Sequence, residues 1–169
     1  MSSERTLVMN AGQIERRINR LAWQVYEHCF NEKEIIIAGI EPNGLTLSER
    51  IAAVLRSISP LKVTVAALKV DKENPLEKSA SVSLPEKDFS GKTIIVVDDV
   101  SNSGRTLMYG VDFFLRFKIK SILTVVLVDR DHNRFPVKTN FVGLSLSTTM
   151  QEHITVEFGK NGSDKVFLD

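Results

Sequence analysis

The sequence predicts an α/β fold, in which a central parallel sheet is flanked by helices. Two patterns support this prediction. Short continuous apolar runs, rich in β-branched residues, recur along the chain, and stretches with apolar residues at helical spacing separate them. Strands that alternate with helices in this way form parallel sheets that are buried on both faces. The length of 169 residues suits one domain, spanning residues 1–169.

The predicted elements follow one another in regular alternation. Helical spacing predicts a first helix over residues 10–30, with Asn10 as its N-cap. The apolar run 34–40 predicts a buried strand that ends in a turn at residues 41–44. The same criteria predict helices over residues 45–55 and 105–117, strands over residues 62–68, 92–97 and 121–128, and shorter strands over residues 140–144, 153–158 and 165–168.

Residues 69–90 depart from this alternation. They are rich in Asp, Lys, Glu, Asn, Pro and Ser and show weak periodicity. A loop of this length in a compact domain is usually functional or disordered. We therefore expect residues 69–90 to be either functional or disordered.

Composition excludes several classes of protein. With 43% hydrophobic and 25% charged residues, the chain has the composition of a globular protein rather than of a disordered one. Its 22 basic and 21 acidic residues give a net charge of +1, which demands neither nucleic acid nor an anionic membrane as a partner. Residues 1–6 lack a secretory signal, and no apolar run approaches the roughly 20 residues of a membrane span. We therefore expect a cytoplasmic protein.

The chain has one cysteine, Cys29, which excludes an internal disulfide. Cys29 lies in an apolar stretch, so we expect a semi-buried core residue rather than a reactive thiol. One cysteine and three scattered histidines do not match the ligand spacing of a zinc site. The cysteine and histidine pattern therefore predicts a reduced protein without structural zinc.

Residues 94–106, which read IIVVDDVSNSGRT, concentrate the polar chemistry of the chain. An apolar strand runs into the adjacent carboxylates Asp98 and Asp99, and hydroxyl side chains, a glycine and a predicted helix start follow. Hydroxyl groups, backbone N–H groups near a glycine and a helix N-terminus all favour a phosphate. Carboxylates suit ribose hydroxyls, a positive transition state or the ligand shell of Mg²⁺. The combination predicts a sugar-phosphate site at the carboxyl edge of the sheet.

Residues 96–106 resemble the phosphoribosyl-pyrophosphate (PRPP) signature of the type I phosphoribosyltransferases, with all its acidic, glycine and threonine positions. This resemblance implies a type I phosphoribosyltransferase fold, a central parallel sheet flanked by helices with a small hood, placed at about residues 69–90. Within the family, Asp-Arg-X-His at 129–132 and Phe-Val-Gly at 141–143 resemble the bifunctional branch that pairs uracil phosphoribosyltransferase activity with attenuation of pyrimidine operons. The similarity extends over residues 7–158.

The resemblance also implies roles for individual residues. Asp98 and Asp99 would hold the ribose hydroxyls of PRPP and offset positive charge on the sugar, with Mg²⁺ bound mainly through PRPP. Lys69 or Lys72 of the hood would supply a catalytic cation, and His132 would contact the base or only brace its loop. The PRPP-binding residues would be Asp98, Asp99, Val100, Ser101, Asn102, Ser103, Gly104, Arg105 and Thr106; the pyrophosphate loop would be Glu41, Pro42, Asn43 and Gly44; the base or pyrophosphate region would contain Asp129, Arg130 and His132.

The implied reaction is Mg²⁺-dependent transfer of a phosphoribosyl group from PRPP to a nucleobase, with uracil as the first candidate. It would yield a nucleoside monophosphate and pyrophosphate, and homodimers or homotetramers are common in the family. The alternative is a regulator of pyrimidine genes that senses PRPP or UMP and binds RNA, with weak or no turnover. A third interpretation is a phosphoribosyl-binding scaffold with neither role.

Several positions depart from the family pattern. Pro42 and Asn43 replace a hydroxyl and a basic residue in the pyrophosphate loop, which removes one N–H group and one cation. The hood segment lacks arginine, and a lysine does not reproduce a bidentate guanidinium. On the first helix, Asn19 and Trp23 stand where the attenuator presents Thr and His to RNA, and we expect Trp23 to serve in packing or a subunit contact. These departures favour the regulator or the scaffold, whereas the intact carboxylate pair favours the enzyme.

Overall fold

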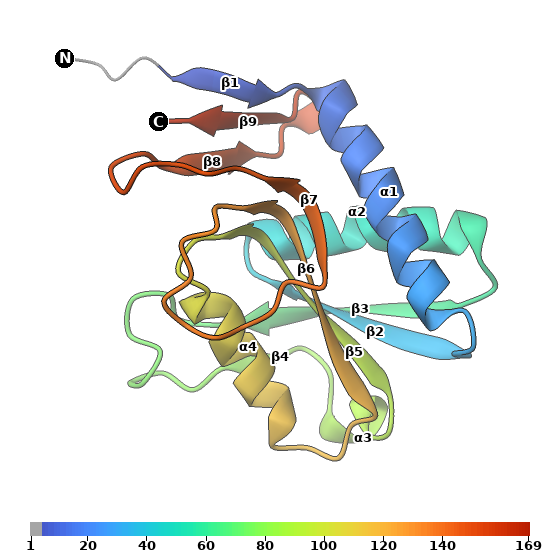
Figure 1. Cartoon of the computed structure of the whole chain (residues 1–169). Helices are drawn as coiled ribbons and strands as arrows, with labels where there is room; N and C mark the ends of the chain where they lie inside the picture. The colour runs from blue at the N-terminus through green and yellow to red at the C-terminus, as the bar shows by residue number, and fades with distance from the viewer. Residues whose placement is uncertain (1–4) are drawn as a thin grey trace.

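The computed structural model describes residues 5–169, which form two β-sheets (Figure 1). The larger sheet has six strands in the order β4-β3-β2-β5-β6-β7, and the smaller, antiparallel sheet has three in the order β1-β9-β8. The strands are β1 (Thr6–Met9), β2 (Glu34–Ile40), β3 (Lys62–Lys69), β4 (Ser81–Val82), β5 (Thr93–Ser101), β6 (Ser121–Asp129), β7 (Phe141–Ser145), β8 (Ile154–Glu157) and β9 (Lys165–Leu168).

The larger sheet is parallel except at the β4 edge, which confirms the predicted fold class. Near its centre, β2 pairs in parallel with β3 and β5; β5 pairs in turn with β6, and β6 with β7. Every residue of β2 from Ile35 to Ile40 is buried. Because both faces of this strand are covered, it reads as an uninterrupted apolar run instead of an alternation of apolar and polar residues.

The helices form one layer on each face of the larger sheet (Figure 1). Helices α1 (Ala11–Cys29) and α2 (Asn43–Ile58) pack on one face, and α4 (Arg105–Leu115) and the short α3 (Glu86–Phe89) pack on the other. A single 3₁₀ turn, Lys160–Gly162, precedes β9. No helix within residues 5–169 is both long and apolar enough to cross a membrane.

Helix α1 begins at its predicted N-cap. The Asn10 side chain accepts a hydrogen bond from Gln13 N, and Gln13 Oε1 accepts one from Asn10 N, both at 2.9 Å. This reciprocal capping satisfies backbone donors that the first turn would leave unpaired. Near the end of the helix Cys29 is buried as expected, and burial raises the pKa of its thiol to about 11. Trp23 does not pack into the core of this chain, because 54% of its surface is exposed.

Residues 69–90 differ from the single hood loop that the sequence suggests. β4 returns to the larger sheet and pairs antiparallel with β3, and α3 buries Phe89 in the core next to α4. The extended loop is therefore restricted to residues 70–80. The separate small sheet comes instead from both ends of the chain, since β1 pairs with β9 and β9 pairs with β8 (Figure 1). Strand β1, of only four residues, depends on that long-range partner and is not predicted from its own sequence.

Candidate functional site

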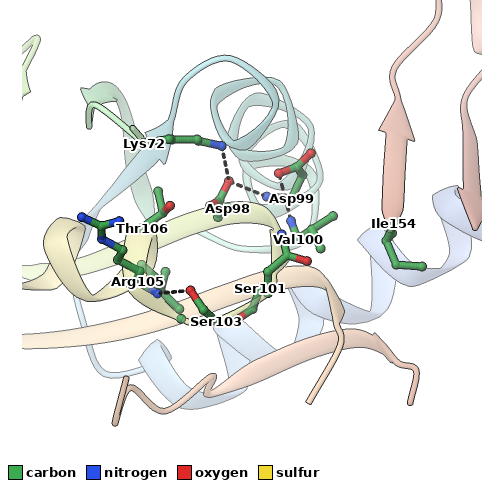
Figure 2. Close-up of a pocket in the computed structure, with 12 residues that line it drawn as sticks. Lys72, Asp98, Asp99, Val100, Ser101, Ser103, Arg105, Thr106 and Ile154 are labelled. Atoms are coloured by element: carbon green, nitrogen blue, oxygen red, sulfur yellow. Dashed lines mark hydrogen bonds and ion pairs between the residues drawn. The ribbon is translucent and has the colours of Figure 1, made fainter. Parts of the chain in front are cut away.

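The loop after β5 lines a cavity at the carboxyl edge of the larger sheet (Figure 2). β5 ends at Ser101 and α4 begins at Arg105, so a short turn joins them. In this turn Gly104 adopts a left-handed backbone with φ 80°, which glycine adopts without steric cost. The cavity is lined by Lys72, Asp98, Asp99, Val100, Ser101, Asn102, Ser103, Gly104, Arg105, Thr106, Leu107 and Ile154. The residues predicted from the motif thus share one cavity, to which the loop after β3 contributes Lys72.

Asp98 is the buried member of the acidic pair, with 3% of its surface exposed. Its Oδ1 accepts a hydrogen bond from Asp99 N at 2.9 Å and lies 3.8 Å from Lys72 Nζ. Burial is the main cause that raises the pKa of Asp98 well above its usual value; the charge of Asp99 adds to the rise, and Lys72 opposes it. Asp98 therefore retains its proton to a higher pH than an ordinary carboxyl group does.

Asp99 lies beside Asp98 but has different hydrogen-bond partners. Its Oδ1 accepts from Val100 N at 2.9 Å, and its Oδ2 accepts from Asn43 Nδ2 at 2.8 Å. With a donor on each oxygen, the orientation of this carboxylate is fixed from two sides. The two aspartates thus differ in what holds them, although they are adjacent in the chain.

Ser101 carries a buried hydroxyl without a protein partner. Within residues 5–169, it is the buried side-chain oxygen for which no hydrogen bond is found, and only 3% of the residue is exposed. Buried polar groups in proteins are nearly always paired, so an unpaired one at a cavity indicates a ligand or water. The hydroxyls of Ser103 and Thr106 line the same cavity beside the N-terminus of α4. This arrangement provides donors for an anion such as phosphate.

The segment after β6 packs against this loop. Arg130 N donates to Ser101 O at 3.0 Å, and Arg134 N donates to Ser103 O at 2.8 Å. A Cβ on Gly104 would lie only 2.8 Å from Val137 Cγ1, so the glycine also permits the close approach of this segment. The loop after β5 is thereby covered on one side by its neighbour along the sheet.

Arg130 is buried (6% exposed), and each of its three guanidinium nitrogens donates a hydrogen bond. Its Nε donates to Thr148 Oγ1 at 2.9 Å and one terminal nitrogen to Asn102 Oδ1 at 2.8 Å. The other terminal nitrogen donates to the carbonyl oxygens of Thr149 and Glu152. Arg130 therefore ties the loop after β5 to the loop between β7 and β8, and its guanidinium is not turned toward the cavity beside Asp98.

The other two residues predicted for the base region also bind protein groups. His132 Nε2 shares a hydrogen bond with Thr148 O. Asp129 accepts from Asp131 N at 2.9 Å and from Thr139 Oγ1 at 2.8 Å. These three hydrogen bonds are of the kind that a bracing residue makes, which is one of the two roles predicted for His132. Arg130 and His132 line a second, smaller cavity that shares Asn102 and Ser103 with the first.

The residues of the predicted pyrophosphate loop do not face a single cavity. Glu41 and Pro42 line a neighbouring cavity, together with Lys69, Val70, Asp71, Lys78, Ser79 and Ser81. Asn43 instead points to Asp99. Lys69 and Lys72 thus line different cavities, and Lys72 is the one that pairs with Asp98.

Two features of the site are not evident from the sequence. Ile154 of β8 lines the cavity, and Asn43 Nδ2 donates to Val156 O of the same strand at 2.9 Å as well as to Asp99. The tail pattern predicts a strand over residues 153–158, but the pattern of a short strand does not say which sheet it joins. Its place beside the acidic pair follows from pairing between chain ends.

Asp98 and Asp99 supply oxygen donors of the kind that Mg²⁺ prefers. Within residues 5–169, no cluster of three or more His, Cys, Asp or Glu side chains is suited to a metal ion. A cage made by these residues alone is therefore absent. An ion shared between two carboxylates and the phosphate and hydroxyl oxygens of a ligand fits this donor set.

The carboxylates, the hydroxyl groups and the helix N-terminus lie together at this edge of a parallel sheet, as the sequence predicts for a sugar-phosphate site. Comparison with protein families agrees: residues 8–159 match the phosphoribosyl transferase domain. The chain therefore belongs to the phosphoribosyltransferase family, as the motif predicts.

Relatives cover nearly the whole chain. The bifunctional protein PyrR of Bacillus pumilus is 30% identical over 169 aligned residues, which cover 93% of this chain and 92% of the relative. The bifunctional protein PyrR of Microcystis aeruginosa is 31% identical over 168 aligned residues, which cover 95% of each chain.

Solved structures confirm the fold. A point mutant of the hypoxanthine phosphoribosyltransferase of Trypanosoma cruzi, in complex with the product IMP, superposes with a TM-score of 0.78 at 14% identity, covering 96% of this chain and 83% of that one. A hypoxanthine-guanine phosphoribosyltransferase of Bacillus anthracis superposes with a TM-score of 0.68 at 21% identity, covering 85% and 84% of the two chains.

Proposed function

We propose that this protein transfers a phosphoribosyl group from PRPP to a nucleobase in the presence of Mg²⁺ and releases pyrophosphate. The observation that carries the proposal is one cavity that contains Asp98, Asp99 and the hydroxyl-rich loop from Ser101 to Thr106. The proposal assigns the ribose to the carboxylates. It assigns the 5-phosphate to the loop and to the N-terminus of α4.

In the proposed reaction a ring nitrogen of the base attacks C1 of the ribose while the bond from C1 to the pyrophosphate oxygen breaks, and the proton that this nitrogen carried leaves with the pyrophosphate. Positive charge develops on the ribose; the Asp99 carboxylate stabilises it electrostatically, and Asp98 does so in its ionised form, which the Lys72 ammonium favours. Because Asp98 is buried, water screens this interaction weakly. Lys72 pairs with Asp98, and the ribose would displace its ammonium toward the leaving pyrophosphate.

The proposed cofactor is Mg²⁺. Asp98 and Asp99 would hold it jointly with ligand oxygens, and the bound ion would neutralise the leaving pyrophosphate. The loop of residues 70–80, which carries Lys72, would exclude water from the cavity. Excluding water matters because water would otherwise consume PRPP by hydrolysis.

We propose uracil as the base, on the resemblance of the segments 129–132 and 141–143 to the bifunctional branch of the family. The proposal also includes one domain over residues 1–169, a role in pyrimidine salvage, a cytoplasmic location and a homodimer or homotetramer. Trp23, exposed on α1, is a candidate for the subunit contact.

A second candidate function is a regulator that senses PRPP or UMP with weak or no turnover. The corner after β2 favours it: Pro42 has no N–H group, Glu41 adds a carboxylate, and the Asn43 amide is committed to Asp99. This corner is poorly suited to hold pyrophosphate. RNA binding has less support, because Arg17 and Arg20 both donate to Gly143 O of β7.

A turnover assay tests the two functions. The protein would be incubated with Mg²⁺, PRPP and one base per reaction, from uracil, hypoxanthine, guanine, xanthine, adenine and orotate, with pyrophosphate release as the readout. Release with uracil alone supports the enzyme. If none of the bases leads to pyrophosphate release, but PRPP or UMP causes a thermal shift, the result contradicts the enzyme and supports the sensor. The absence of both release and shift contradicts both.

A further inference from the structure

Asn43, the first residue of α2, joins three parts of the molecule through one amide nitrogen. Its Nδ2 donates to Asp99 Oδ2 at 2.8 Å and to Val156 O at 2.9 Å. The assignment of the amide follows from chemistry, since a carboxylate and a carbonyl oxygen only accept hydrogen bonds. Asn43 thereby connects α2, the acidic end of β5 and strand β8 of the small sheet.

The backbone around Asn43 leaves it little freedom to move. A Cβ on the next residue, Gly44, would lie 2.5 Å from Val97 O, so the start of α2 is in direct contact with the end of β5. On the preceding side, Glu41 N donates to Leu68 O at 3.0 Å. The amide therefore projects from a backbone that is held on both sides.

Both partners of the amide contribute to the cavity. Asp99 supplies one of its two carboxylates, and β8, whose carbonyl at Val156 accepts the second hydrogen bond, also carries the lining residue Ile154. A change at Asn43 would release Asp99 Oδ2 and one anchor of β8 together. Asn43 itself does not line that cavity.

We propose that Asn43 is a positioning residue, which orients Asp99 toward the ribose and holds β8 and Ile154 at the wall of the same cavity. This inference rests on the proposed function, in which Asp99 acts on the ribose. It assigns Asn43 to the carboxylate side of the site rather than to the leaving pyrophosphate.

Two substitutions at Asn43 distinguish misorientation of the Asp99 carboxylate from the mere loss of the two hydrogen bonds that Asn43 donates. Asn43→Asp keeps the shape, removes both donated hydrogen bonds and sets a carboxylate against Asp99. Asn43→Ala removes the hydrogen bonds without adding charge. Asn161→Asp is the matched control, because it makes the same chemical change at an exposed residue of the turn before β9.

We expect kcat with PRPP and uracil to fall roughly ten- to hundred-fold in Asn43→Asp, the range of a lost hydrogen bond to a charged group. Asn43→Ala is expected to lose less, and Asn161→Asp none. The KM for uracil should stay unchanged in Asn43→Ala. A purely structural role would instead lower the melting temperature and the active fraction, with kcat per folded molecule unaltered.

Product binding keeps the two proposals separable. UMP affinity, measured by calorimetry, needs no turnover, and Asn43→Asp should weaken it through the ribose hydroxyls.

If the parent protein turns over PRPP and Asn43→Asp matches it in kcat and UMP affinity, the positioning role is wrong and the proposed function stands. If the parent binds UMP without turnover and Asn43→Asp binds UMP more weakly, the transferase proposal fails and the positioning role stands. If the parent neither turns over nor binds UMP, both are overturned.

Discussion

The end of β5 with the loop after it (residues 98–106) and the end of β6 with the segment after it (residues 129–140) both carry charged and hydroxyl side chains, yet they use them differently. The sequence predicts residues 98–104 as a polar loop, but β5 continues to Ser101, so the acidic pair lies in the strand. In the first, Ser101 Oγ has no partner among the described residues, and Asp98 is buried with a raised pKa. In the second, Arg130 makes hydrogen bonds through all three of its nitrogens, and His132 and Asp129 bond to neighbouring protein groups. The unpaired hydroxyl of Ser101 is the group that a ligand or water would pair, whereas the paired side chains hold the walls of the cavity in place.

The largest effect that this comparison predicts is on turnover. Asp98→Asn combined with Asp99→Asn should lower kcat by roughly 10²–10³-fold, because both groups that offset charge on the ribose are neutralised. Steady-state rates with PRPP and uracil measure it. Asp112→Asn, at an exposed surface pair with Arg116, is the control. Unchanged turnover in the double variant would show that the catalytic site lies elsewhere.

The next largest effect is on the free energy of unfolding, and it comes from a substitution at Arg130, just after β6. Arg130→Ala should lower the free energy of unfolding by about 1–3 kcal/mol, since it removes a buried guanidinium and its hydrogen bonds to part-buried acceptors of the loop between β7 and β8. Urea denaturation provides the measurement. Arg116→Ala, an exposed partner of a surface pair, should change it little. An Arg130 variant as stable as the parent would contradict the bracing role.

A smaller effect is expected at Ser101. In contrast to Arg130→Ala, the substitution should change ligand affinity and leave stability unchanged. Ser101→Ala removes a hydroxyl that bonds to no described protein group, so the melting temperature should not fall. UMP affinity should fall by roughly two- to tenfold if the hydroxyl serves a ligand, as expected for one hydrogen bond. Calorimetry and thermal melting on the same sample distinguish the outcomes. A lower melting temperature with unchanged affinity would place Ser101 among the paired, structural groups.

The last prediction concerns the pH dependence of stability that Asp98 causes, and it gives the direction of the effect without a magnitude. The folded-state pKa of Asp98 is raised, mainly by burial, so the folded protein binds more protons than the unfolded one between the ordinary and the raised pKa. Stability from Asp98 is therefore present at low pH and falls as the pH rises through that window. Asp98→Asn should remove this fall and be the more stable form at alkaline pH. Urea denaturation at a series of pH values measures it, and a parallel pH dependence in both proteins would contradict it.

Much of the architecture could be predicted because it depends on local patterns. The run at residues 34–40 matches β2 in full, and Asn10 caps α1 as predicted. The motif at residues 94–106 predicts both the cavity and the family, since its carboxylates, hydroxyls and glycine are adjacent in the chain. Residues that are contiguous in sequence need only one strand, one turn and one helix to come together.

The sequence by itself determined the fold class, the acidic pair and the family of this protein. The tertiary structure decided which polar residues are free and which are paired: that Lys72 rather than Lys69 pairs with Asp98, that Arg130 braces a loop, and that Asn43 contacts Asp99. It also decided that the small sheet is built from the two ends of the chain, β1 with β8 and β9. The physical reason is that these contacts join residues far apart in the chain, and their geometry depends on the packing of whole elements, which no local pattern of residues records.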